Sequence, residues 1–274
     1  ALTLFSSTWL GCTEASMEVM NDVDLASADA SMNTTPDAAA ETLGPGPYSI
    51  VYTASGGIGI DQRTPITAVV SASGDLDAWN FGTESHMRGS NQTGERYADA
   101  LSLLGRWNGG TGTKTYTMTD GFHYGLVLKP TAAPPMGTTS YTQLKATSAT
   151  IDDGTLAVGT IKGKLSVLFA PGSKKAGLDL TIDMPGDAQY TGTTTGGIAD
   201  PSQSTVSGTA ELMAGQLNMT STGISCAGGS PCKASVRAYV GGGSNNTARA
   251  VVVFVISSGG SNAKVLRGAM VFGS

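Results

Sequence analysis

From Tyr48 onward, short runs of β-branched and aromatic residues alternate with turn residues, and no stretch repeats its apolar positions with a helical period. Every second position of residues 178–184 is apolar and the positions between are polar, which predicts a strand with one buried and one solvated face. Residues 251–256 are apolar at every position, so a central strand is expected there. The pattern therefore predicts an all-β fold.

The spacing of these runs predicts how the strands are organised. Residues 140–272 contain eight or nine strand-like runs, and eight antiparallel strands can close into a barrel filled by its own side chains. The last run, residues 264–272, is expected to pair with the strand at 251–256 through a turn at 258–260. We therefore predict an eight-stranded antiparallel barrel over residues 138–274, a smaller β unit over 47–137, and an acidic N-terminal segment over 1–46.

Charge is distributed unevenly along the chain. Residues 1–62 hold eight acidic side chains and no basic one, and the whole chain has a net charge of −5. Residues 13–46 are rich in Ala, Ser and Thr and end at a Gly-Pro-Gly-Pro break, so they lack the apolar density to fold alone. The acidic balance argues against a nucleic-acid partner, and no apolar run approaches the roughly 20 residues of a membrane-spanning helix.

The first twelve residues contain a predicted strand and a cysteine, and each of these features has two possible interpretations. Residues 1–10 alternate apolar side chains on two faces, which predicts a strand that adds to a sheet edge of its own chain or of a neighbouring copy. Leu10-Gly11-Cys12 is similar to the end of a bacterial lipoprotein signal, which makes Cys12 a candidate lipid attachment site. Trp9 and Leu10 are poor occupants of such a signal, so an unmodified Cys12 is the favoured alternative.

The other two cysteines are predicted to pair. Cys226 and Cys232 are separated by Ala-Gly-Gly-Ser-Pro, which is flexible enough for the two sulfur atoms to meet. A disulfide that closes so short a loop stabilises the fold by roughly 2 kcal/mol and indicates an oxidising compartment. Two reduced, buried thiols are the alternative, and a zinc site is disfavoured because no histidine lies nearby in the sequence.

Catalytic motifs are absent from the sequence. The only imidazoles are His86 and His123, and neither belongs to a nucleophile, zinc-protease or phosphate-binding motif. Asp75, Asp77 and Glu84 lack the spacing of a calcium loop and are interpreted as solvated turn residues. No catalytic residue, metal site or cofactor is therefore predicted.

Two short motifs are candidate binding residues. His123 and Tyr124 are of the types that ligate haem iron, although alternation in a strand points His123 away from Tyr124 and favours a packed histidine. Arg106 and Trp107 could contact an anionic partner, and the alternative is a structural cation–π contact between them.

Several of these motifs occur in an order that resembles a known family. Gly105-Arg106-Trp107 is followed by His123-Tyr124, by residues 163–169 (Gly-Lys-Leu-Ser-Val-Leu-Phe), by the Cys226–Cys232 segment and by the closing Gly-Ala-Met-Val-Phe at 268–272. The set resembles the C-terminal β-barrel domain of proteobacterial envelope proteins related to transferrin-binding protein B, including versions attached to FecR-like proteins. The resemblance covers roughly residues 47–274 and is best beyond residue 105.

This resemblance implies an eight-stranded barrel at the outer-membrane surface or in the periplasm of a Gram-negative bacterium. We therefore expect a non-enzymatic binding or accessory protein whose partner is another envelope protein or a copy of itself. The loops at residues 223–231 and 241–247 are expected to make the contact. The alternative is a structural subunit of an extracellular assembly, joined through the N-terminal strand. A transmembrane barrel is a further alternative, disfavoured because only 6% of the residues are aromatic.

Overall fold

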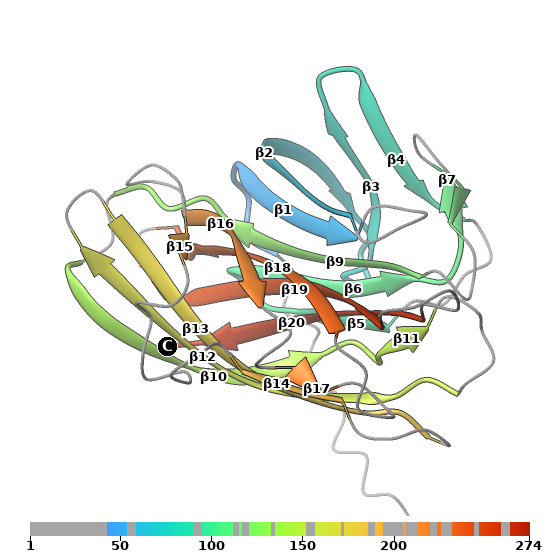
Figure 1. The fold of residues 1–274 in the computed structure, drawn as a ribbon. Coiled ribbons are helices and arrows are strands. Elements are labelled where there is room, and N and C mark those ends of the chain that lie inside the picture. Colours follow the sequence, from blue (N-terminus) through green and yellow to red (C-terminus); the bar gives the residue numbers. More distant parts are fainter. Residues whose placement is uncertain are drawn as a thin grey trace, which may run out of the picture. The chain divides into compact units, whose positions relative to one another are not determined.

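The computed structural model describes residues 43–53, 59–89, 95–111, 115–116, 121–132, 135–151, 157–170, 173–185, 190–193, 205–206, 213–219, 224–225, 232–243, 247–258 and 264–274. These residues form β-strands and turns without any helix (Figure 1). No helix in this described part of the chain is therefore long and apolar enough to cross a membrane. The predicted all-β class is confirmed.

The first sheet contains nine strands, and all its paired neighbours are antiparallel. Their order across the sheet is β5-β6-β9-β1-β2-β3-β4-β7-β8. The strands are β1 (Tyr48–Thr53), β2 (Ile60–Val70), β3 (Leu76–Phe81), β4 (Glu84–Arg88), β5 (Glu95–Ala98), β6 (Ser102–Trp107), β7 (Gly110–Thr111), β8 (Thr115–Tyr116) and β9 (Phe122–Leu128).

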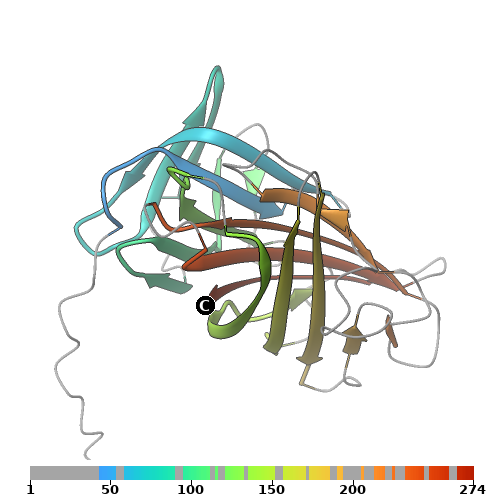
Figure 2. The same cartoon turned by 90° about the vertical axis from the view of Figure 1, so that its left-hand side faces the viewer.

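The second sheet contains eleven antiparallel strands from the rest of the chain. Nine follow the order β16-β18-β19-β20-β10-β12-β13-β14-β17, while β11 pairs with β20 and β15 pairs with β13. The strands are β10 (Gly137–Ala146), β11 (Thr150–Ile151), β12 (Thr160–Ala170), β13 (Ser173–Asp183), β14 (Tyr190–Thr193), β15 (Thr205–Val206), β16 (Met213–Met219), β17 (Ile224–Ser225), β18 (Cys232–Gly241), β19 (Arg249–Ser258) and β20 (Val265–Gly273). Figure 2 shows the long neighbours β12 and β13 and the strong bend of β10.

The prediction of a closed eight-stranded barrel preceded by a separate smaller β unit is wrong. Both sheets curl like half-barrels, and among the described residues the two end strands of the second sheet, β16 and β17, do not pair with each other. The strands of the first sheet lie between Tyr48 and Leu128, and this sheet belongs with the second sheet to one compact unit over residues 38–274. Barrel closure was expected because it removes exposed edges and buries one face. Here the central strands bury both faces, because the first sheet packs against the second.

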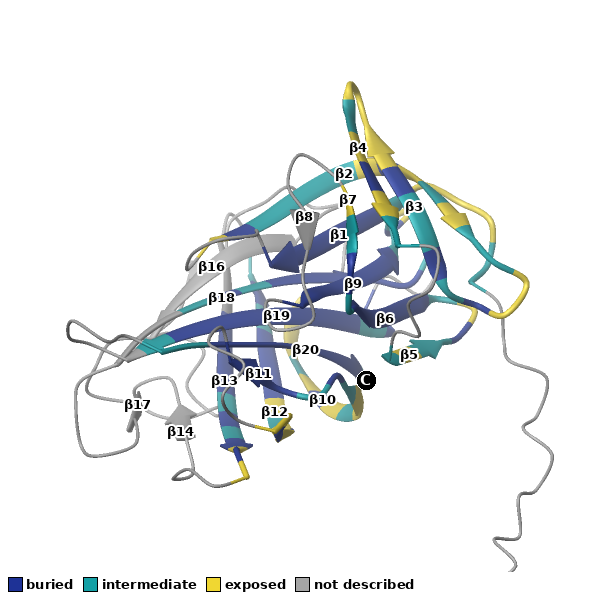
Figure 3. Ribbon diagram, turned by 90° about the vertical axis from the view of Figure 1, so that its right-hand side faces the viewer, coloured by how far each residue is buried: buried dark blue, intermediate teal, exposed yellow. Residues whose placement is uncertain are grey.

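Three apolar layers result from this packing. One lies on the far face of the first sheet (the first-sheet core), one between the two sheets (the inter-sheet core), and one within the curl of the second sheet (the second-sheet core). Figure 3 shows that β1, β6, β9, β19 and β20 are largely buried, whereas the tip of the β3–β4 hairpin is exposed. The inter-sheet core consists of Val51, Ile60, Leu104, Val127, Tyr239, Val251, Val253, Val255, Ala269 and Val271.

The position of β19 between two apolar layers explains why residues 251–256 are apolar at every position. Alternate side chains of this strand enter two different layers: Val251, Val253 and Val255 lie in the inter-sheet core, and the residues between them lie in the second-sheet core. The predictions of a central strand here and of its pairing with the C-terminal strand are confirmed. The alternation predicted for residues 178–184 is also confirmed, because Leu178, Leu180, Ile182 and Met184 are all buried in the second-sheet core.

Candidate functional site

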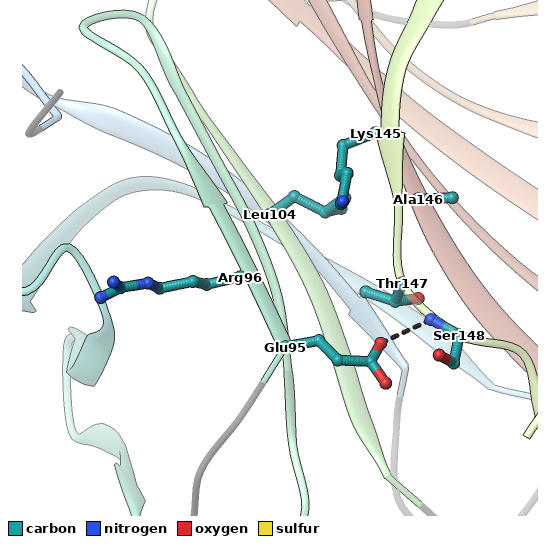
Figure 4. A pocket seen from close by; sticks show the side chains of 7 residues that line it. All are labelled: Glu95, Arg96, Leu104, Lys145, Ala146, Thr147 and Ser148. Atoms are coloured by element: carbon teal, nitrogen blue, oxygen red, sulfur yellow. Dashed lines mark hydrogen bonds between the residues drawn. The ribbon is translucent and has the colours of Figure 1, made fainter. Parts of the chain in front are cut away.

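A small pocket lies where the β5–β6 hairpin approaches the end of β10 (Figure 4). Its volume is about 240 Å³, and its walls come from both sheets. In Figure 4 the Glu95 side chain crosses the pocket toward Thr147 and Ser148, and Lys145 reaches toward Leu104. The lining residues are Glu95, Arg96, Leu104, Lys145, Ala146, Thr147 and Ser148.

Glu95 is held by partners on both sides of this pocket. Its Oε1 accepts a hydrogen bond from Arg106 Nη2 at 2.7 Å, and its Oε2 accepts one from the backbone N–H of Ser148. Burial by itself raises the pKa of Glu95, but these hydrogen bonds and the positive charge of Arg106 outweigh it, so the pKa lies below its usual value. The carboxylate therefore stays ionised and joins the two sheets.

His123 lies beside this pair, fully buried on the inter-sheet face of β9. Its Nδ1 is 2.9 Å from Thr147 Oγ1, and its Nε2 is 2.8 Å from Thr150 Oγ1. Burial, then the nearby charges of Arg106 and Arg267, lower its pKa well below the usual value. The imidazole is therefore neutral, and both ring nitrogens are engaged, one as donor and one as acceptor. Haem iron could be ligated only after one of these bonds was broken.

The four residues predicted as a binding set are divided between two faces. Arg106 and His123 are paired neighbours on β6 and β9 and face the second sheet. Trp107 and Tyr124 belong to the first-sheet core on the opposite face, where Trp107 donates a 2.8 Å hydrogen bond to the carbonyl of Leu76. Arg106 and Trp107 therefore do not stack on each other, since adjacent strand residues point to opposite faces.

A second polar cluster, which the sequence did not predict, ties the β3–β4 hairpin to β1 and β2. Glu84 accepts hydrogen bonds of 2.8 Å from Tyr52 Oη, Arg63 Nε and His86 Nε2. The His86 ring is buried and stacks on Trp79, with their centroids 4.1 Å apart. The four residues come from three strands, so no local spacing signals them.

The protonation states of this cluster are complementary. Burial alone raises the pKa of Glu84, yet its three donors lower it overall. Burial lowers the pKa of His86 despite the adjacent carboxylate. At neutral pH an ionised Glu84 thus accepts a hydrogen bond from a neutral imidazole.

The acidic residues considered as a calcium site are paired with arginines. Arg88 Nη2 lies 2.6 Å from Asp77 Oδ1, and Arg96 Nη1 lies 3.5 Å from Asp75 Oδ2. Glu84 belongs to the separate cluster around Tyr52. Among the described residues, no group of three or more His, Cys, Asp or Glu side chains is arranged to hold a metal ion.

A solvent-open hollow lies at one end of the sheets, beside the predicted contact loop at 241–247. Its volume is about 430 Å³, and backbone hydrogen bonds fix its rim: Lys129 N to Pro47 O, Thr131 N to Gly243 O and Gly242 N to Leu128 O, at 3.0–3.1 Å. We call it the proline hollow. It is lined by Pro45, Gly46, Pro47, Leu128, Lys129, Pro130, Thr131 and Gly243.

Other predicted sites fall outside the described residues. They include Cys12, the N-terminal strand, Cys226 and most of the loop at 223–231. Cys232 begins β18, but its side chain is not among those described, so the disulfide stays a prediction.

Comparison with known proteins adds no family. No protein-family model matches the chain, and no curated protein matches it. Function must therefore be argued from the residues and their geometry.

Proposed function

We propose that this protein is a non-enzymatic binding or accessory protein of a Gram-negative envelope, and that the proline hollow contacts its partner. The observation that supports this most directly is a preformed apolar hollow beside the loop at 241–247. Three prolines and Leu128 are among the residues that line it, and the backbone hydrogen bonds of Pro47, Leu128 and Gly243 hold its rim. Loops fixed on a rigid scaffold commonly carry binding residues, and little conformational entropy is lost when such a surface binds.

The engagement of the polar side chains agrees with a binding role. His86 and His123 are both buried and hydrogen-bonded within the fold, and Glu84 and Glu95 each accept bonds from an arginine. These groups stabilise strand contacts. The envelope location is supported by the resemblance to transferrin-binding-protein-B-like barrels and by the low charged content of 14%. It would place the chain in the periplasm or at the outer-membrane surface, with another envelope protein as partner.

Binding can be tested with the full chain immobilised over a solubilised Gram-negative envelope fraction. A captured protein is then purified, and its dissociation constant is measured against Pro45→Arg and Pro47→Arg, which place a long cation in the hollow. Both variants are expected to bind about tenfold more weakly. Thr160→Arg, on the exposed start of β12, is the matched control and should bind like wild type. Equal affinity for all variants would reject the hollow as the contact, and no specific capture would reject the binding role.

A structural subunit is the second candidate, favoured by an apolar row on the outer face of the β2–β3–β4 region. Val69, Ala78 and Met87 are aligned neighbours across the three strands, and Val69 and Met87 are 51% and 56% exposed. Self-association through this face predicts that Met87→Lys converts an oligomer into a monomer in size-exclusion chromatography. Removal of residues 1–10 tests strand donation in the same assay, and a wild-type monomer would eliminate both routes.

A further inference from the structure

A groove follows β10 and β12 on a different part of the second sheet. Its volume is about 590 Å³, within the range of sites that enclose small ligands or a few side chains of a partner. Ser140 pairs with Ser166, and Thr142 pairs with Lys164, across the floor of the groove. Because strand side chains alternate, Thr142, Lys162 and Lys164 face solvent while Tyr141 and Leu165 enter the second-sheet core.

The floor of the groove is fixed by one side chain at the point where the two strands separate. Beyond Thr142, β10 no longer pairs with β12, while its other edge pairs with β20 from Thr142 to Ala146. The Gln143 amide then takes over the interstrand bonding, because its Oε1 accepts from Gly163 N at 2.5 Å and its Nε2 donates to Ile161 O at 3.1 Å. The groove therefore follows from the divergence of the two strands, and the Gln143 amide holds part of its floor in place.

The charged side chains that line the groove are both lysines. Lys162 and Lys164 are both exposed, and in the described part of the chain neither takes part in an ion pair. Asp179 lies opposite Lys164 on β13 but is not within salt-bridge distance of its ammonium group. The Ser140 and Thr142 hydroxyls add donors beside the two ammonium groups. This combination favours carboxylates.

The spacing of the two lysines selects the form of the ligand. They are two residues apart on one strand face, which separates them by about 6.6–6.8 Å along the strand. Alternate side chains of an extended peptide repeat at the same distance. We propose that this groove binds an extended acidic segment of a partner protein, with carboxylates at alternate positions that meet Lys162 and Lys164. The site is separate from the proline hollow, so either can exist without the other.

Fluorescence anisotropy with the full chain tests this proposal. The probe is a labelled synthetic peptide that alternates Asp and Thr, and the comparison peptide has the same composition with its Asp residues grouped in one block. The alternating peptide is expected to bind saturably, and the block peptide about tenfold more weakly. The double variant Lys162→Gln/Lys164→Gln should bind the alternating peptide about tenfold more weakly than wild type, while Lys264→Gln, at a lysine outside the groove, should bind like wild type.

Several outcomes would overturn the proposal. Equal binding of the two peptides, or equal loss in both lysine variants, would indicate a non-specific charge effect. Binding of anionic phospholipid vesicles in preference to the peptide, with the same loss in the double variant, would assign the lysines to a membrane surface. Absence of saturable peptide binding at low salt would reject the site. Circular dichroism of each variant checks that it is folded before its binding is compared with wild type.

Discussion

At the scale of single residues, His123 shows how a histidine can be fixed without a charge. Its two ring nitrogens contact the hydroxyls of Thr147 and Thr150, which lie 24 and 27 residues further along the chain. The complete burial of the ring disfavours protonation most, and the charges of Arg106 and Arg267 disfavour it further. Alternation in β9 predicted that this ring points away from Phe122 and Tyr124. It could not predict the threonines, because they come from another sheet.

This burial makes stability depend on pH in a defined direction. The folded-state pKa of His123 lies well below its usual 6.5, so below that value the unfolded chain binds a proton that the folded chain does not. The contribution of His123 to the free energy of unfolding is fully present above pH 6.5. It declines as the pH falls below that value, by up to about 1.4 kcal/mol for each pH unit. Urea denaturation between about pH 7 and pH 5 should show a slope in wild type that includes this contribution, and a slope smaller by up to about 1.4 kcal/mol per pH unit in His123→Gln.

His86 contributes a slope of the same sign, because burial also lowers its pKa. The lowered pKa values of Glu84 and Glu95 contribute stability that is lost only as the pH falls below their usual 4.5, outside this window. His86→Gln therefore serves as the matched comparison and should remove the part of the pH dependence of stability that His86 contributes. Identical slopes for wild type and His123→Gln would mean that the His123 imidazole titrates normally in the folded protein.

The same substitution, Tyr to Phe, is expected to have opposite effects on stability at two buried tyrosines. Tyr141 is buried in the second-sheet core, and its Oη has no hydrogen-bond partner among the described residues. Tyr141→Phe removes an unsatisfied polar atom and should raise the free energy of unfolding by about 1 kcal/mol. Tyr52→Phe removes the donor to Glu84 and should lower it by about the same amount. Urea midpoints measure both changes, and a destabilised Tyr141→Phe would reveal a partner for this hydroxyl.

At the scale of elements, β10 is a strand that changes partners. It pairs with β12 up to Thr142 and with β20 from there to Ala146. Gln143 bridges the gap that this leaves on β12, where Ile161 O and Gly163 N would otherwise face no strand. A polar side chain thus substitutes for backbone pairing at the divergence.

Gln143→Leu keeps the side-chain size but removes both bridging bonds. The amide of Gly163 should then exchange its hydrogen at least about tenfold faster, and the free energy of unfolding should fall by about 1–2 kcal/mol. Hydrogen exchange resolved by residue measures the first change, and urea denaturation the second. Thr142→Val, at the exposed neighbouring position, is the control and should leave Gly163 protected. Unchanged protection in Gln143→Leu would show that the strand divergence does not depend on this amide.

Sequence patterns identified individual strands better than their arrangement. The alternation at 178–184 and the apolar run at 251–256 both predicted the burial that the strands have. In β18, Val236, Ala238 and Val240 enter the second-sheet core, and Tyr239 on the other face is also buried. A tyrosine can occupy either a wet or a covered face, so the sequence did not indicate that a second sheet covers this strand.

The candidate site was predictable only in part for the same reason. Arg106 and His123 could be selected as unusual residues within strands, and they do lie side by side. Their decisive partners, Glu95 and Thr147, come from β5 and from the segment after β10. Such contacts depend on how two sheets pack, which the period of a single strand does not specify.

At the scale of the whole molecule, the two sheets are joined by contacts that leave little room between them. Asp99, next to β5, accepts a 2.7 Å hydrogen bond from Arg249 of β19. Burial by itself raises the pKa of Asp99, but Arg249 and the neighbouring N–H donors lower it overall. At the centre of the inter-sheet core, Gly125 of β9 approaches Val251 of β19 so closely that a Cβ added to the glycine would lie 2.8 Å from the valine Cβ. The sheets can pack at this distance only because one residue lacks a side chain.

This close approach predicts that substitutions at Gly125 and Val251 have effects on stability that are not additive. Gly125→Ala should lower the free energy of unfolding by about 1–3 kcal/mol, because neither of the two Cβ atoms can rotate away. Val251→Gly should also destabilise, by removing buried apolar contacts. The double variant should be more stable than the sum of the single effects by about 1–2 kcal/mol, since the alanine methyl occupies part of the vacated space. Gly125→Ala with Val253→Gly is the control pair and should be additive. Additivity in the Gly125–Val251 pair as well would mean that the sheets separate at little cost, and that their contact does not set the stability of the fold.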